Sequence, residues 1–360
     1  MLLTIANIML IVFVVLIAYW WANQGLFSAM LHFACVVLAG AVTLAFWEPL
    51  TMLTMTGGKF DNYAWGVIFL GLFSVTLFTA RLITNRLVPN NIEVPQWANL
   101  LLGGAFGAAS GVLTMGIVVI GMGFIQSHHS LMGYKGFGRD NGTGKVVQYD
   151  DNRLWFQVHY YTNEFFGLLS VGSLKTSQPM RHYYPDLHAQ ASLVRDSYRD
   201  GRGQLSLAPD AAEIIDASIT QQGRPTCTVS VHFKPEARDF GRQLTLSRSQ
   251  VRLIGDGSGT NEAEVVFPTR WTTGTGHHSF VNDATAYVTS VSGQSEATVV
   301  FEFDIPPGMT PRFIQIKGTR FELPQLQTRS PGQMVSVPQT REREQVEGTA
   351  PNIDSLVSVG

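Results

Sequence analysis

The chain opens with a stretch that contains no Asp, Glu, Lys or Arg: residues 1–47 read MLLTIANIMLIVFVVLIAYWWANQGLFSAMLHFACVVLAGAVTLAFW. A charged side chain at the centre of a bilayer costs at least about 2.5 kcal/mol. Charge-free apolar runs of about 20 residues are therefore typical of membrane spans, and this stretch is long enough for two of them. We expect this part of the chain to lie in a membrane rather than in water.

The first 126 residues continue the same pattern. Their acids and bases are few, namely Glu48, Lys59, Asp61, Arg81, Arg86 and Glu93. We predict a membrane domain over residues 1–126 with four transmembrane helices, at about 2–21, 26–47, 63–84 and 99–125. Each run is long enough to cross roughly 30 Å of hydrocarbon at about 1.5 Å per residue. The alternative, a set of buried helices in a soluble protein, does not account for four such runs in succession.

The few basic residues predict the orientation of the spans. Arg81 and Arg86 lie at the end of the third span, with only Lys59 on the opposite side. The positive-inside rule places the arginine side in the cytoplasm. The N-terminus, the loop 48–62 and everything after residue 126 are then extracytoplasmic. The first span lacks a basic leader, so we expect it to be retained rather than cleaved as a signal peptide.

Tryptophans lie near the ends of the spans and in the segment that follows them. Because indole rings favour the boundary between hydrocarbon and water, we predict an interfacial position for each. These residues are Trp20, Trp21, Trp65, Trp97 and Trp155. His32, which lies about six residues into the second span, is also expected near the interface.

The fourth span carries a glycine every four residues. Gly103, Gly107 and Gly111 fall on one helix face, where the small-xxx-small pattern lets another helix approach closely. This helix-packing face can lie inside the bundle or between protomers of a homo-oligomer, and the sequence leaves both open.

The polar part of the chain divides by composition and periodicity. We predict a Gly-rich linker at 127–150, an amphipathic and helical connector at 151–210, a β-sandwich at 211–325 and a disordered tail at 326–360. The helical pattern at 152–174 fits a helix in the membrane interface or one packed on the following domain. Alternating strands are expected near 228–233, 244–246, 251–254, 265–267, 286–288, 299–303 and 313–316.

Motifs for catalysis or metal binding are absent from the sequence. The adjacent pairs at 128–129 and 277–278 are the only neighbouring histidines, and they lack a third ligand at a motif spacing. The segment 256–262 has oxygen ligands without the spacing of a calcium loop, and Cys35 and Cys227 form no metal motif. We therefore expect no enzyme activity and no cofactor. The absence of a basic block argues against nucleic-acid binding.

The membrane part resembles the colicin V production protein (CvpA) family. The residues that carry this resemblance are Gly-Leu-Phe at 25–27, Asn-Leu-Leu-Leu-Gly-Gly-Ala-Phe-Gly at 99–107, and Gly111. The strands at 298–306 and 312–316 resemble those of bacterial immunoglobulin-like modules. The expected fold is thus a four-helix membrane domain followed by an all-β, immunoglobulin-like sandwich.

The family resemblance implies a function in colicin-type toxin production or export, or in envelope maintenance. It also implies a multi-pass protein of the bacterial inner membrane with both termini extracytoplasmic. The expected partners are the lipid bilayer, further copies of the chain and an envelope protein bound through the sandwich. The alternative is an oligomeric channel or transporter subunit built on the glycine face of span four. A proton-coupled pump is disfavoured because the spans lack buried carboxylates.

Overall fold

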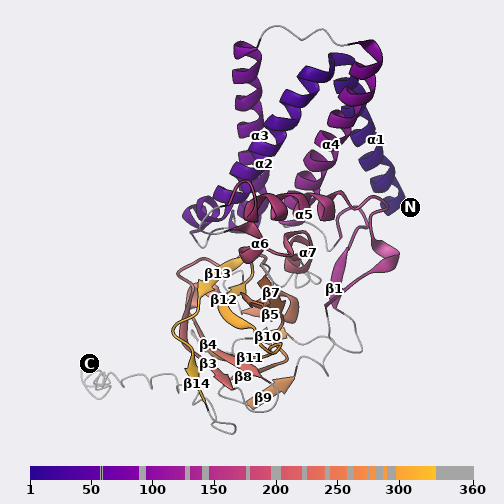
Figure 1. The fold of residues 1–360 in the computed structure, drawn as a ribbon. Coiled ribbons are helices and arrows are strands. Elements are labelled where there is room, and N and C mark those ends of the chain that lie inside the picture. Colours follow the sequence, from indigo (N-terminus) through magenta and orange to yellow (C-terminus); the bar gives the residue numbers. More distant parts are fainter. Residues whose placement is uncertain are drawn as a thin grey trace, which may run out of the picture.

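A computed structural model describes residues 1–56, 58, 60–88, 95–125, 130–139, 146–175, 179–195, 204–220, 225–239, 244–257, 263–273, 276–279, 287–289 and 297–329. A group of long helices forms one end of the molecule and a β-sandwich forms the other, with short helices between them (Figure 1).

Four helices are long and apolar enough to cross a membrane, as predicted. They are α1 (Leu2–Gln24), α2 (Leu26–Thr54), α3 (Asp61–Leu87) and α4 (Gln96–Gly123). The α1–α2 turn and the outer ends of α3 and α4 lie at the far end from the sandwich, whereas the N-terminus and the end of α4 lie near it (Figure 1). This arrangement agrees with the prediction that successive loops lie alternately at the two ends of the membrane helices.

The second helix is longer than the sequence predicted. We expected the span to end at Trp47 and a loop to begin at Glu48, but α2 continues through Pro49 to Thr54. A proline inside a helix removes one backbone hydrogen bond and bends the helix without always ending it. Because Glu48 is paired with a residue of the sandwich, its charge does not mark the start of a solvated loop.

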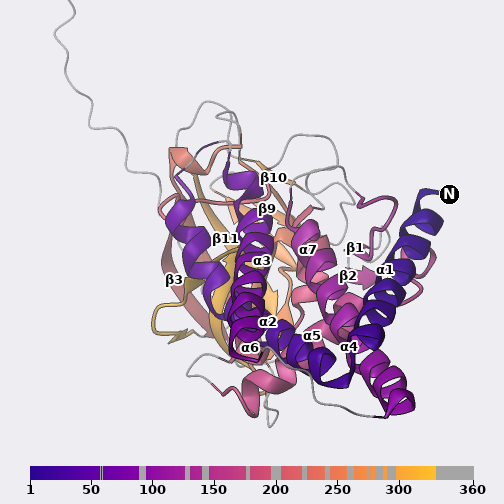
Figure 2. The ribbon, with the colours of Figure 1, turned by 90° about the horizontal axis from the view of Figure 1, so that it is seen from above.

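Helix α4 occupies the centre of the membrane group. Viewed from above, it lies between α1 on one side and α2 and α3 on the other (Figure 2). Its lower part also contacts α5 (Val158–Val171) and α7 (Leu187–Leu193). Glycines along α4 permit these approaches: a Cβ at Gly116 would lie 2.0 Å from the Thr162 hydroxyl, and one at Gly123 would lie 2.8 Å from the Ala191 Cβ.

The segment between the membrane helices and the sandwich is a packed layer. It contains a hairpin of β1 (Phe137–Arg139) and β2 (Val146–Gln148), followed by α5, α6 (Met180–Tyr183) and α7. The prediction of a plain Gly-rich linker at 127–150 is therefore wrong where these strands form. The predicted amphipathic helix begins at Val158 rather than 152. It packs against α4, and Phe166 reaches α2, where a Cβ at Gly40 would overlap its ring.

Two sheets form the sandwich. One has six strands in the order β14-β3-β4-β11-β8-β9, the other has four in the order β13-β12-β6-β7, and β5 pairs with β10. The bounds are β3 Ala212–Thr220, β4 Thr226–Phe233, β5 Thr245–Ser247, β6 Val251–Asp256, β7 Ala263–Val266, β8 Arg270–Thr273, β9 Gly276–Ser279, β10 Tyr287–Thr289, β11 Ala297–Asp304, β12 Thr310–Ile316, β13 Thr319–Glu322 and β14 Gln327–Thr328.

The core of the sandwich follows from strand alternation. On β4, Cys227, Val229, Val231 and Phe233 are each at most 1% exposed, as expected for alternate residues facing the opposite sheet. All strand pairs in the two sheets are antiparallel except β14 with β3, which is parallel. Strand β14 lies inside the predicted disordered tail 326–360, so that boundary is too early; residues 330–360 lie outside the described part.

Candidate functional site at the membrane junction

An aromatic cluster joins the lower ends of the membrane helices to the connector. Trp47 of α2 is 1% exposed, and its ring centroid lies 5.1 Å from Trp65, 5.3 Å from Phe69, 5.3 Å from Phe124 and 5.2 Å from Tyr184. Edge-on and tilted contacts at these separations are favourable beyond the apolar area they bury. One hydrophobic core therefore runs from α2, α3 and α4 into α6 and onto strands β6, β7 and β12.

Trp65 of α3 extends this core to the sandwich itself. It is 2% exposed, and a Cβ at Gly318, in the turn between β12 and β13, would lie 3.1 Å from its ring. Gly318 also has a φ of +86°, a conformation that favours glycine. The predicted interfacial position of Trp65 is therefore wrong. Its indole packs on the sandwich and is not exposed to lipid.

A buried ion pair lies beside the aromatic cluster. Arg320 of β13 donates two hydrogen bonds to Glu48 of α2, one from Nε to Oε1 at 3.0 Å and one from Nη2 to Oε2. The side chains are 10% and 14% exposed. The guanidinium carbon lies 4.4 Å from the ring centre of Tyr183 and 4.7 Å from that of Tyr184. Burial lowers the pKa of Arg320 to about 9, opposed by the Glu322 carboxylate, so the side chain is charged at neutral pH.

Polar contacts also attach the connector to the sandwich. Arg252 of β6 donates from Nη1 to the carboxylate of Asp186 at 2.7 and 2.9 Å, and from Nη2 to Gln190 at 2.8 Å. The backbone N–H of Leu205 donates to Asn62 of α3 at 3.1 Å. The pair of Arg320 and Glu48 is bidentate, with two nitrogens on two oxygens, and such pairs fix orientation as well as distance. The sandwich is therefore held on the membrane helices in one orientation rather than tethered to them.

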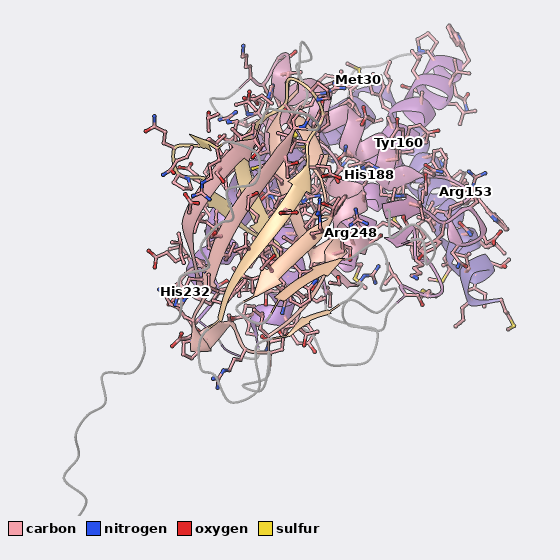
Figure 3. The ribbon with its side chains drawn as sticks, turned by 90° about the horizontal axis from the view of Figure 1, so that it is seen from below. Met30, Arg153, Tyr160, His188, His232 and Arg248 are labelled. Carbon is pink, nitrogen blue, oxygen red and sulfur yellow. The ribbon has the colours of Figure 1, made fainter. Side chains whose placement is uncertain are left out.

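A second polar cluster is buried near the C-terminal end of α4, on the side of the sandwich. The Tyr134 hydroxyl and His159 Nε2 share a hydrogen bond at 2.8 Å, and the ring of His188 lies 5.8 Å from that of His159. Figure 3 shows His188 beside Tyr160, whose ring centre is 5.4 Å away. Arg195 is 2% exposed, and its Nε and Nη1 have no partner among the described residues.

Burial shifts the pKa values of Tyr134, His159 and Arg195 in this cluster. It lowers the pKa of His159 to about 3, with a further contribution from His188, and it raises the pKa of Tyr134 to about 12. The pKa of Arg195 falls to about 10 through burial, opposed by Tyr134. The histidine is therefore neutral at physiological pH. The cluster is poised to lose stability on acidification, because protonation of a buried imidazole is costly.

The glycine face of α4 packs against α1 of the same chain. Built Cβ atoms at Gly103, Gly107 and Gly111 would lie 3.4, 2.9 and 3.1 Å from the α1 backbone at residues 22, 18 and 14. Glycines four residues apart on α4 face residues four residues apart on α1, in the reverse order. This is the pattern expected for two antiparallel helices in close contact. The face predicted to serve either the bundle or an oligomer is thus occupied within the bundle. An oligomeric pore built on it has no free surface here.

The other predicted tryptophans have different surroundings. Trp20, Trp97 and Trp155 are 62%, 71% and 63% exposed, so they are available to a bilayer interface, although their depth in a membrane stays a prediction. Trp21 is stacked on His32 at 4.1 Å between ring centres, and the Arg81 guanidinium lies 4.8 Å over the Trp21 ring.

The remaining candidate ligands form no site in the part of the chain that the structure describes. No group of three or more His, Cys, Asp or Glu suited to a metal occurs among those residues. The backbone of His277 and His278 lies in β9, paired with β8. The histidines at 128–129 and the loop residues 258–262 fall outside the described residues.

Sequence reasoning missed the junction because its members are far apart. Glu48 and Arg320 are separated by 272 positions, and no local pattern connects them. One feature of the sequence could have indicated the pair. Glu48 is one of few charged residues before position 126, and no basic residue lies near it in the sequence. A lone carboxylate at the end of a span needs either water or a distant cation.

Comparison with known proteins identifies the membrane part. No curated protein and no solved structure matches the chain. Residues 3–132 match the family model described as Colicin V production protein, and this range covers α1 to α4. The part of the chain that holds the four membrane helices is thus similar to the colicin V production protein family, as the residues at 25–27 and 99–111 predicted.

Proposed function

We propose that the protein is a non-enzymatic, multi-pass protein of the bacterial inner membrane that holds a β-sandwich rigidly on the extracytoplasmic face. We propose further that it acts in colicin-type toxin production or export, or in envelope maintenance, and that the sandwich presents a surface to an envelope partner. The similarity of the membrane helices to the colicin V production protein family supports the proposed role in toxin production.

The observation that carries the proposal is the buried junction. A flexibly tethered module would share no core with its anchor, whereas here Trp47, Trp65 and the Glu48–Arg320 pair are buried between the two parts. Breaking a buried ion pair by removing one partner costs about 3–5 kcal/mol, so the docked orientation is energetically preferred. A sandwich fixed in this way meets its partner at one height and one angle above the membrane.

The orientation is tested by single-cysteine labelling in intact cells. Cys35 and Cys227 are both buried and are first replaced by alanine. A cysteine at the exposed Asp304 of the sandwich should react with a membrane-impermeant maleimide without permeabilisation. A cysteine at Asn85, near the C-terminal end of α3 and far from the sandwich, should react only after the membrane has been permeabilised. The reverse result would contradict the extracytoplasmic assignment.

The function is tested by charge reversal at the junction. In a strain that lacks the gene, Glu48→Arg or Arg320→Glu should fail to restore toxin export or resistance to detergent, and the double exchange should restore it. The matched control is Arg270→Glu, which breaks a pair with Glu302 on the exposed sandwich surface, where Arg270 is 59% exposed. Surface pairs contribute about 0–1 kcal/mol, so this variant should behave as wild type. Full activity of both single variants would refute a role for the docked sandwich.

A further inference from the structure

A groove of about 280 Å³ lies beside the junction, between α2, α5 and α6. Ala41, Leu44 and Ala45 of α2 line it, and Glu48 follows on the same helix face at the spacing i, i+3, i+4, i+7. Leu169 contributes from α5. The groove thus changes along α2 from apolar walls within the predicted span to a charged end beside the sandwich.

The charged end is formed by Arg320 together with its partner Glu48. Glu48 accepts from Arg320 Nε and Nη2, and Nη1 has no partner among the described residues. The hydroxyl-bearing residues Tyr183, Tyr184 and Ser170 also line the groove, and Arg320 Nη2 donates to the Tyr184 hydroxyl at 3.3 Å. A buried guanidinium nitrogen without an acceptor is costly, and a phosphate oxygen is a strong acceptor for it.

The mouth of the groove is apolar and faces outward. Phe46 is 55% exposed and Leu174 is 45% exposed, and both belong to the lining. In a membrane such side chains contact lipid tails rather than water. The order of surfaces is apolar within the span and polar at its edge, where the Glu48–Arg320 pair lies. This order matches that of an acyl chain and a polar headgroup in a phospholipid.

We propose that this groove binds a phospholipid, with an acyl chain along α2 and α5 and the phosphate at Arg320. The volume is just below the roughly 300 Å³ at which ligand pockets begin, so it accommodates part of one chain and leaves the rest of the lipid in the bilayer. This lipid would fill the space between the membrane helices and the docked sandwich. The inference is independent of the proposed cellular function.

The test measures phospholipid retained by the full-length protein after extensive washing in dodecyl maltoside, by native mass spectrometry. The wild type should retain phospholipid. Ala41→Trp, which fills the groove, should lower the affinity for added phosphatidylglycerol by about tenfold, which corresponds to about 1.4 kcal/mol. The matched control is Ala6→Trp, because Ala6 lines a separate apolar hollow of about 220 Å³ between α1 and α4. This control should retain phospholipid as the wild type does.

Thermal melting checks that each variant is folded. If Ala41→Trp is not folded, the smaller substitution Ala41→Leu is used for the affinity measurement instead. Four outcomes would overturn the proposal. The wild type could retain no phospholipid, which needs no variant to interpret. A folded Ala41 variant could bind phosphatidylglycerol as tightly as the wild type. Retained lipid could consist of species without phosphate, or inorganic phosphate alone could displace the phospholipid fully, which would leave an anion site without an acyl-chain site.

Discussion

The contact between α1 and α4 leads to a quantitative prediction about two neighbouring glycines. A Cβ at Gly107 would lie 2.9 Å from the Ala18 Cα and 3.0 Å from its carbonyl oxygen, whereas one at Gly104 would meet nothing closer than the Ala22 Cβ at 3.7 Å. Optimal carbon–carbon separations are about 3.5–4.0 Å. Gly107→Ala therefore forces α1 to move by about 0.6–1.1 Å, and Gly104→Ala does not.

The expected cost follows from this displacement. Overpacking of a close contact destabilises by about 1–3 kcal/mol. Both substitutions replace glycine by alanine in the interior of the same helix, so the gain in helix propensity of up to about 1 kcal/mol is common to both. The free energy of unfolding of Gly107→Ala should thus lie about 1–3 kcal/mol below that of Gly104→Ala.

The assay is equilibrium unfolding of the full-length protein in mixed micelles with increasing dodecyl sulfate, followed by tryptophan fluorescence. Each variant is measured at two protein concentrations, since a contact within one chain gives a concentration-independent midpoint. Equal stabilities of the two variants would refute the close α1–α4 packing. A difference that appears only at high concentration would place the face between protomers instead.

Two further predictions concern the same contact and the buried histidines. In a chain with Cys35 and Cys227 replaced by alanine, Ala22→Cys with Gly104→Cys should form a disulfide within one chain, because the 3.7 Å Cβ separation matches the usual 3.5–4.5 Å; disulfide-linked dimers on a non-reducing gel would contradict this. The pKa of His159 is about 3 in the folded protein and about 6.5 in the unfolded chain, so only the unfolded chain takes up a proton between these values. The free energy of unfolding should therefore fall as the pH drops below about 6.5, by up to about 1.4 kcal/mol per pH unit. His159→Gln should flatten this dependence, and an unchanged slope would exclude His159 as its source.

Much of the membrane domain was predictable because the bilayer imposes one simple rule. Charge is excluded from hydrocarbon, so the charge-free runs located all four helices to within a few residues at most ends. The predicted end of α2 at Trp47 was wrong because a contact with a distant strand was not foreseen. Glu48 and Pro49 indicate a helix end when only local contacts are considered, but Arg320 neutralises the carboxylate from a distant strand.

The sandwich was predictable as a class and only partly in detail. Alternation located β4, β6, β11 and β12, because alternate residues of these strands face a shared core. It missed β3, where the register shifts between Ile214 and Asp216 and breaks the period of two. It also missed the short β8 and β13, which are too brief for a period to emerge. Whether the sandwich is immunoglobulin-like stays a prediction.

The candidate site was the least predictable part. Trp65 was expected at a lipid interface because tryptophans near span ends usually lie there. Its burial depends on Gly318, more than 250 positions away, which no local pattern connects to it. The segment 127–150 was predicted to be a linker because its glycines suggested flexibility, although Gly136 lies against Tyr134 in a close turn.

The central claim is that the sandwich is fixed on the membrane helices. The most direct measurement is the distance distribution between spin labels on Val67 of α3 and Asp304 of the sandwich, recorded by pulsed electron resonance in lipid nanodiscs without the two native cysteines. Both residues are exposed, and they lie on opposite sides of the junction. A fixed sandwich should give one narrow distribution that broadens when Arg320 is replaced by alanine. A broad distribution in the otherwise unaltered protein would contradict it.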